Sequence, residues 1–228
     1  MPKPKYSKTI LCLANSRKTS GRCVAGREVV NNVLGDWVRP VSVREKGELS
    51  ELDRRYENGQ HPQVLDIIRI PMLDVKPHQF QAENHLINDG YYWTLESQVN
   101  WDGVHNALDG PAPLWTNGAS SYSGINDRVS VANLGHPQGT LRLIKVADFS
   151  VHVVVEGAEF GNGKRKVRGR FTHGGVQHYL AITDPQIERQ YFAGANGDFQ
   201  IGEAIVCISL GELYNDYAYK LIASVITA

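Results

Sequence analysis

Runs of β-branched and aromatic residues recur along the chain, separated by short stretches rich in Gly, Asn, Asp and Ser. Such runs predict β-strands, because branched side chains pack well on a pleated surface and the intervening residues favour turns. In the first half, the pattern predicts strands at 8–15, 22–30, 36–43 and 63–73. In the second half, it predicts a hairpin over 140–157 that turns near Ala147–Ser150, then strands at 166–175, 176–184, 203–211 and 217–227.

Three segments predict helices instead. The segment 47–59 has Ser50 as an N-cap, Asp53 at the spacing of a capping box and Gly59 as a stop. A short helix is expected near Trp101, within 97–110. Residues 185–192 predict one or two helical turns, with Pro185 at the first position and Asp184 as the cap.

Residues 91–139 differ in character from the segments on either side. Trp93, Trp101 and Trp115 lie here among Gly, Asn, Ser and Pro, which favour loops. We expect a connection that packs its aromatic rings on the core, since so long a structureless stretch is unusual in a compact domain. Short strands, glycine turns and few helices predict a mostly β fold of small barrels. The expected organisation is a first barrel at 1–90, a connecting segment at 91–139 and a second barrel at 140–228.

Composition narrows the class of protein. The chain has 228 residues, 42% of them hydrophobic and 21% charged, which is enough apolar material for a sizeable core. The formal net charge is zero, so any site for a polyanion must come from local clustering of charge. Cys12, Cys23 and Cys207 are an odd number without paired spacing, which indicates a reducing compartment. With no apolar run of membrane-spanning length, we expect a cytoplasmic protein that does not bind membranes.

The segment "SRKTSGRCVAGRE" (16–28) comes close to a nucleotide-binding phosphate loop. Gly21 and Gly26 have the required spacing, but Arg27 and Glu28 replace the Lys and Ser/Thr of that motif. The residues that follow, "VVNNVLGDW", indicate a strand and a turn rather than the helix that such a loop needs. Two alternatives remain open: a glycine-rich hairpin with solvated cations, or an electropositive loop along a nucleic-acid backbone.

Two clusters of basic residues favour the second alternative. The first consists of Arg17, Lys18, Arg22 and Arg27, and the second of Lys164, Arg165, Lys166, Arg168 and Arg170. Because side chains alternate along a strand, Lys166, Arg168 and Arg170 should share one face, with Val167 and Phe171 on the other. A basic strand face beside a glycine loop suits a polyanion, although charged outer faces of hairpins are also common.

Single-stranded nucleic acid also needs aromatic rings on which bases can stack. The candidates are Trp37, Phe171, Tyr179 and Tyr217, each of which could equally be a core residue. Arg39 lies two residues after Trp37 and so on the same strand face. Trp37, Arg39 and Phe171 are therefore the predicted base contacts.

The sequence predicts no bound metal, no cofactor and no identifiable catalytic residue. His173 with His178, and His78 with His85, lack partners at the spacing of a metal site. Gly-x-Ser-x-Gly is absent, and Asp184 is explained by its capping position.

The stretches "ILCLANSRKTSGRCVAGRE", "GDWVRPVS", "QVLDIIRIP", "YLAITDP" and "ISLGELYNDYAYKLIASVI" follow in this order along nearly the whole chain. In this the chain resembles the bacterial family of dual OB domain-containing proteins. The resemblance implies two consecutive OB-like barrels and, by analogy, nucleic-acid binding in a bacterial defence or mobile-element setting. It implies no catalytic residues.

The combined prediction is a non-catalytic protein that binds single-stranded DNA or RNA through the two basic clusters. Two rivals remain, because one fold can carry many functions. One is an enzyme or sensor that binds a nucleotide-like small molecule in a pocket between the 15–27 and 120–128 loops. The other is a protein-interaction module that docks an effector partner.

Overall fold

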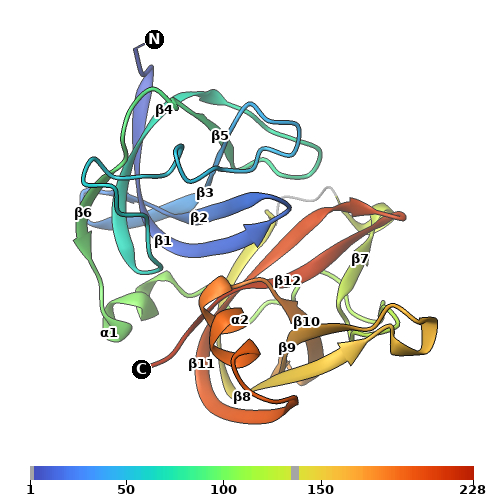
Figure 1. Ribbon diagram of the computed structural model, residues 1–228. Coiled ribbons are helices and arrows are strands. Elements are labelled where there is room, and N and C mark those ends of the chain that lie inside the picture. The colour runs from blue at the N-terminus through green and yellow to red at the C-terminus, as the bar shows by residue number, and fades with distance from the viewer. Residues whose placement is uncertain (1–2, 135–138) are drawn as a thin grey trace. The chain divides into compact units, whose positions relative to one another are not determined.

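The computed structural model describes residues 3–134 and 139–228. The chain divides into two compact units, Met1–Ala107 and Leu108–Ala228, and most of each unit is a β-sheet (Figure 1). Each unit contains a six-stranded sheet formed by six consecutive strands of the chain.

Unit 1 is built from strands β1 (Tyr6–Lys18), β2 (Gly21–Val30), β3 (Val33–Val41), β4 (Asp66–Val75), β5 (Asn84–Ile87) and β6 (Thr94–Gln98). The strand order is β1-β2-β3-β5-β4-β6, and β1 also pairs with β4, which closes a barrel. The pair β3–β5 is parallel and the other pairs are antiparallel. Helix α1 (Trp101–Val104) and a 3₁₀ turn (His105–Ala107) end the unit.

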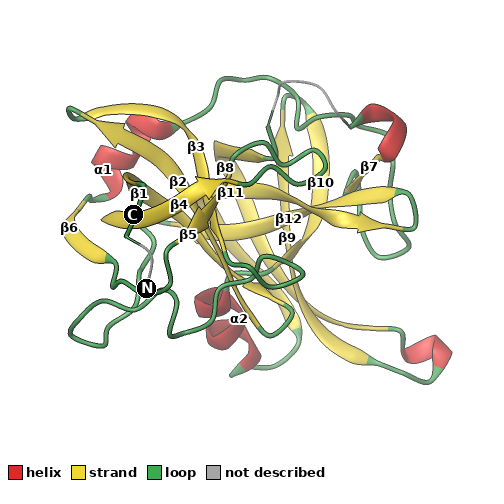
Figure 2. Cartoon of the chain, turned by 90° about the horizontal axis from the view of Figure 1, so that it is seen from above, coloured by secondary structure: helices red, strands yellow, loops and turns green. Residues whose placement is uncertain are grey.

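Unit 2 repeats this connectivity with strands β8 (Leu141–Glu156), β9 (Lys164–His173), β10 (Val176–Ile182), β11 (Gly197–Tyr214) and β12 (Tyr217–Ile226). The order is β10-β9-β8-β11-β12, and a parallel β10–β12 pair closes the barrel. Strand β7 (Arg128–Ser130) adds to β12. Helix α2 (Pro185–Phe192) joins β10 to β11, and short 3₁₀ turns lie at Val131–Asn133 and Ala158–Phe160 (Figure 2).

Both units therefore have the strand order 1-2-3-5-4-1, with a parallel pair between the third and fifth strands. A five-stranded Greek-key barrel of this kind is the OB architecture. The expectation of a mostly β chain with two consecutive OB-like barrels and short helices is confirmed.

Each barrel has its own apolar interior. In unit 1 the core includes Ile10, Val24, Ile68 and Trp93, and in unit 2 it includes a larger cluster around Phe149. The segment 91–139 is shared between the units: β6 and α1 belong to unit 1, whereas the residues from Leu108 onward belong to unit 2.

The helix expected at 47–59 is wrong: the segment is a series of turns. The Ser50–Asp53 capping pair does form, with the Ser50 N–H donating to Asp53 at 2.7 Å and the Asp53 N–H to the Ser50 hydroxyl at 3.3 Å. The backbone on either side of this pair forms isolated β-bridges with other segments, Leu49 with Arg22 and Tyr56 with Trp93. These strand-like pairings remove the backbone groups that a helix would bond internally.

The hairpin expected at 140–157 is also wrong, because β8 runs unbroken through Ala147–Ser150. Its neighbour β11 has register shifts on both sides of Gly202, which has a φ of +86°. Bulges of this kind bend a strand and sharpen its twist. The polar residues near Asp148 therefore mark a bend in one long strand. By contrast, α2 and α1 form where they were expected, α2 with Asp184 accepting from the Gln186 N–H at 2.9 Å.

Candidate nucleic-acid interface

The outer face of β9 and β10 in unit 2 carries an arginine directly opposite a tyrosine. Arg170 pairs in register with Tyr179, and its guanidinium lies 5.0 Å from the centre of the Tyr179 ring. Arg170 is exposed and Tyr179 is half-buried. Strand alternation explains the placement, since Val167 and Phe171 point into the core between the outward-facing residues.

Arg168 lies on the same outer face but is engaged in an ion pair. Its guanidinium contacts both carboxylate oxygens of Glu156, and its Nη2 is 3.2 Å from Oε2. Only 8% of Arg168 is exposed, and its guanidinium also lies 5.5 Å from the Tyr179 ring. Arg168 therefore supports Tyr179, while its charge is balanced by Glu156 rather than available to a ligand.

A line of hydrogen bonds supports Tyr179 on another side. The Ser150 hydroxyl is 2.9 Å from Nε2 of His152, and Nδ1 of His152 is 2.6 Å from the Asp198 carboxylate. The His152 ring meets the Tyr179 ring edge-on, with centroids 5.4 Å apart. Burial raises the pKa of Tyr179, against the opposing charges of Arg168 and Arg170, so the phenol stays neutral at physiological pH.

Unit 1 has the same arrangement on the equivalent strands. Arg27 on β2 pairs in register with Trp37 on β3, and its guanidinium lies 4.8 Å from the centre of the indole ring. Nη1 of Arg27 also donates to the Gly35 carbonyl at 3.3 Å. Trp37 is partly buried, and its Nε1 has no hydrogen-bond partner within the described residues. Both barrels thus place a second-strand arginine over a third-strand aromatic ring.

The other residues of unit 1 that were predicted to bind nucleic acid lie at the β1–β2 end of the barrel or inside it. Arg17 is exposed, the Lys18 ammonium donates to the Lys46 carbonyl, and Arg22 forms the backbone bridge to Leu49. Arg39 is only 3% exposed and pairs with Glu83 at 3.1 Å. A buried ion pair of this kind leaves Arg39 no surface with which to touch a base.

The second cluster is divided in the same way. Lys164 and Lys166 are exposed, whereas Arg165 is held by hydrogen bonds. Arg165 donates to the Asn196 side chain at 2.9 Å, to the carbonyl of Phe192 at the end of α2 at 3.1 Å, and to the Gly194 carbonyl at 2.7 Å. Arg165 therefore ties the end of α2 to β9. Phe171 is 1% exposed in the core, where it stacks on His178, so it cannot accept a base.

The glycines of the near-miss phosphate loop have a packing explanation. A Cβ at Gly26 would lie 2.0 Å from the Leu11 carbonyl oxygen, and one at Gly21 would lie 2.5 Å from the Leu49 carbonyl oxygen. Both positions require glycine because another backbone segment passes so close. The segment covers the end of β1, the β1–β2 turn and most of β2, and the next element is strand β3 rather than a helix.

Within residues 3–134 and 139–228, no group of three or more His, Cys, Asp or Glu side chains is placed to hold a metal ion. None of the helices in those ranges is long and apolar enough to cross a membrane. The three cysteines are free thiols.

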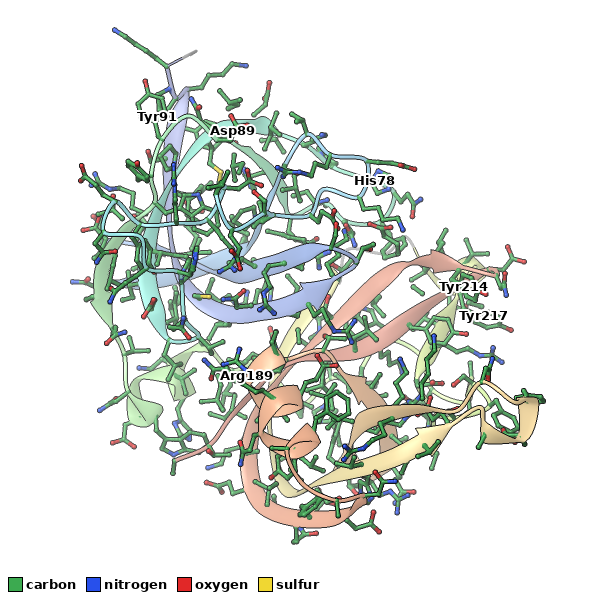
Figure 3. All side chains as sticks on the ribbon, in the orientation of Figure 1. His78, Asp89, Tyr91, Arg189, Tyr214 and Tyr217 are labelled. Atoms are coloured by element: carbon green, nitrogen blue, oxygen red, sulfur yellow. The ribbon has the colours of Figure 1, made fainter. Side chains whose placement is uncertain are left out.

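Sequence reasoning weighed Tyr179 only as one aromatic among four and did not consider Ser150, His152 or Asp198. The signal was present in "FSVHVV" (149–154), where Ser150 and His152 alternate with apolar residues and so share the outer face of β8. Asp198 could not be found this way, because its pairing with His152 depends on the bent course of β11. Tyr217 carries Arg128 at 4.0 Å over its ring and lies with Tyr214 at the β11–β12 turn (Figure 3).

The chain matches the model of a known protein family. The model of the family described as the dual OB-containing domain matches residues 8–225. No curated protein and no solved structure matches the chain.

Proposed function

The chain belongs to the dual OB-containing domain family, and from that premise we propose that it binds single-stranded nucleic acid through the outer faces of the second and third strands of each barrel. OB barrels bind oligonucleotides on this face. The observation that carries the proposal is the repeated pair: Arg27 over Trp37 in unit 1 and Arg170 over Tyr179 in unit 2. The two pairs occupy equivalent strands and equivalent register.

The two pairs supply both interactions that bind a single strand, namely base stacking and contacts to phosphate. A base that stacks on an aromatic ring contributes about 1–3 kcal/mol, whatever its identity. Arg27 and Arg170 lie beside these rings, and the exposed Lys164 and Lys166 continue the positive charge along β9. Phosphate contacts of this kind release counterions, so binding should weaken steeply as salt increases.

The test is fluorescence anisotropy with labelled single-stranded DNA and RNA at about 50 and 200 mM salt. Trp37→Leu and Tyr179→Leu should each weaken binding about 5- to 150-fold, the equivalent of one lost stacking contact. Arg170→Gln should weaken binding and reduce its salt dependence. Tyr91→Leu and Arg189→Gln are the matched controls: Tyr91 is an exposed aromatic in the β5–β6 loop, and Arg189 is an exposed cation on α2 (Figure 3).

An affinity that is unchanged in Trp37→Leu and Tyr179→Leu, or that falls equally in the two controls, would refute this interface. Failure of the wild type to bind either nucleic acid at low salt would refute the function itself. An affinity for the labelled strand that does not change with salt would mean that the protein does not contact phosphates, and it would contradict the proposed interface.

We also propose that the protein acts in the bacterial cytoplasm, in defence or mobile-element biology, as family analogy implies. The three free thiols suit a reducing compartment. Bacterial cells carrying the wild-type gene should resist phage or plasmid challenge better than cells carrying the Trp37→Leu/Tyr179→Leu double variant. Equal resistance of the two kinds of cell would contradict the proposed role in defence.

One observation favours a second candidate, an acyl hydrolase. The order Ser150 Oγ, His152 Nε2, His152 Nδ1 and Asp198, at 2.9 and 2.6 Å, is the order of a catalytic triad. In that reaction Ser150 Oγ attacks an ester carbonyl and its proton passes to His152, which then gives it to the leaving alcohol. Water releases the acyl group by the reverse transfer. Arg170 pairs in register with Ser150, and its guanidinium would stabilise the developing negative charge.

A fluorophosphonate probe followed by intact-protein mass measurement tests this candidate. The hydrolase requires one covalent adduct on Ser150 that is absent in Ser150→Ala and His152→Phe. A wild-type chain that remains unlabelled leaves Ser150 and His152 with their supporting role around Tyr179.

A further inference from the structure

Arg54 in unit 1 is a buried arginine whose Nε has no hydrogen-bond partner within the described residues. Only 5% of the residue is exposed. Arginine cannot lose its proton in a protein, so this charge stays buried in the folded state. Burying a charge without a partner is strongly unfavourable, and such a group calls for a specific explanation.

A second unpartnered nitrogen lies close by, on His61. The Tyr56 N–H donates to the Gln60 carbonyl at 2.8 Å, and this tight turn brings His61 back beside the residues that follow Arg54. Nδ1 of His61 is buried without a hydrogen-bond partner among the residues that the structure describes. The next residue is fixed to β1, because the Asn15 side-chain amide donates to the Pro62 carbonyl at 2.6 Å.

Arg22 adds a second guanidinium to this corner of the barrel. Two backbone hydrogen bonds of 2.9 Å join Arg22 to Leu49, at the start of the turns that carry Arg54. Burial lowers the pKa of Arg54, and the charge of Arg22 lowers it further. Burial is the main cause that lowers the pKa of His61, and the charge of Arg54 lowers it further, whereas the charge of Glu51 opposes both. The charges of Arg22 and Arg54 thus both act on the His61 ring, and the charge of Glu51 opposes them.

We propose that Arg22, Arg54 and His61 form an anion site in unit 1 that binds a phosphate monoester group. A guanidinium fork matches the oxygen geometry of phosphate, and a phosphate oxygen would accept from the unpartnered Nε–H of Arg54. The site is separate from the Arg27–Trp37 pair and goes beyond the proposed binding of a nucleic-acid backbone. Its ligand chemistry is shared by the terminal phosphate of a strand and by a free nucleoside monophosphate.

Thermal unfolding of the full chain in inorganic phosphate, against chloride of equal ionic strength, tests the site without any base or strand. Phosphate should raise the unfolding temperature of the wild type, because a ligand of the folded state stabilises it. Arg54→Met should abolish this rise. Because it removes a buried N–H that has no acceptor within the described residues, it should also increase the unfolding temperature in chloride, which distinguishes a ligand site from a structural arginine.

The matched control is Arg55→Met at the neighbouring position. Arg55 lies 5.0 Å over the Tyr92 ring, so its replacement should leave the effect of phosphate unchanged. His61→Phe is a second variant that should reduce the response to phosphate. The proposal is overturned if phosphate does not stabilise the wild type, or if it stabilises Arg54→Met as much as the wild type.

Binding of 5′-phosphorylated and 5′-hydroxyl oligonucleotides then distinguishes the two sources of phosphate. A tighter complex with the 5′-phosphorylated strand, lost in Arg54→Met, assigns the site to strand ends. Equal oligonucleotide binding together with Arg54-dependent binding of a nucleoside monophosphate assigns it to free nucleotides. The assay with inorganic phosphate contains no nucleic acid, so it can support the anion site even if the proposed nucleic-acid binding fails. Likewise, nucleic-acid binding can be supported even if inorganic phosphate has no effect.

Discussion

Replacing Lys220 by methionine should stabilise unit 2 near neutral pH. Lys220 lies on β12 with 1% of its surface exposed, and its ammonium donates to the Thr116 carbonyl at 2.7 Å. Burial lowers the pKa of Lys220 to about 8, and the charge of Asp127 opposes this only in part. The lysine is therefore charged at neutral pH in a place that disfavours its charge.

The size of the effect follows from the two pKa values. In the unfolded chain the lysine has its ordinary pKa of 10.5, so between about pH 8 and 10.5 the unfolded state binds more protons. The stability of unit 2 should rise with pH across this window. At about 1.4 kcal/mol per unit of pKa, the buried charge of Lys220 destabilises the folded state by about 3 kcal/mol below pH 8, relative to a lysine with an unchanged pKa. Lys220→Met also loses the hydrogen bond to Thr116, which costs about 1 kcal/mol of stability. The net gain in the free energy of unfolding is therefore about 2 kcal/mol at neutral pH.

Urea unfolding of the wild type and Lys220→Met near pH 7 and near pH 9.5 measures this directly. The variant should be the more stable at the lower pH, and the difference should shrink at the higher pH. Lys145→Met is the control, because Lys145 is an exposed lysine paired with Glu203 at 3.0 Å. A variant that is less stable than the wild type at both pH values would refute the reasoning, as would an equal pH dependence in the two proteins.

Three further outcomes can be measured by the same unfolding assay. Glu83→Gln should lower the free energy of unfolding by about 3–5 kcal/mol, because it removes the carboxylate charge that faces the buried Arg39 guanidinium. A loss below about 1 kcal/mol, which is typical of exposed ion pairs, would contradict the buried geometry. Gly26→Ala should destabilise unit 1 strongly through backbone overlap, whereas Gly35→Ala, with no atom closer than 3.8 Å, should not; equal effects would contradict the close approach. Burial lowers the pKa of His178 to about 4, so unit 2 should lose about 3 kcal/mol as pH falls from 6.5 to 4, and His178→Phe should remove this loss; acid unfolding that is unchanged in the variant would contradict it.

The strands could be predicted because their signal is local. Branched residues, turn residues and the cap at Asp184 act within a few positions, and the structure places β1, β9 and α2 where these signals lie. The errors arose where distant pairing overrides a local signal. Ser50 and Asp53 form a capping pair without a helix, because strand-like bridges to Arg22 and Trp93 take up the neighbouring backbone.

The candidate site was predictable in part for the same reason. Alternation along β9 correctly placed Arg170 on the outer face, but it could not show that Glu156 pairs with Arg168. The register between strands was also out of reach of the sequence. That register is what places Arg27 opposite Trp37 and Arg170 opposite Tyr179, and so reveals one arrangement repeated in two barrels.

Photochemical crosslinking tests the central claim most directly. A single-stranded oligonucleotide containing 5-iodouridine, bound to the full chain and irradiated, should form adducts on Trp37 and Tyr179, which mass spectrometry can locate. Excess unlabelled strand should compete these adducts away. Adducts confined to aromatics outside the two strand faces, such as Tyr91, or no adducts under conditions where the strand is bound, would contradict the account.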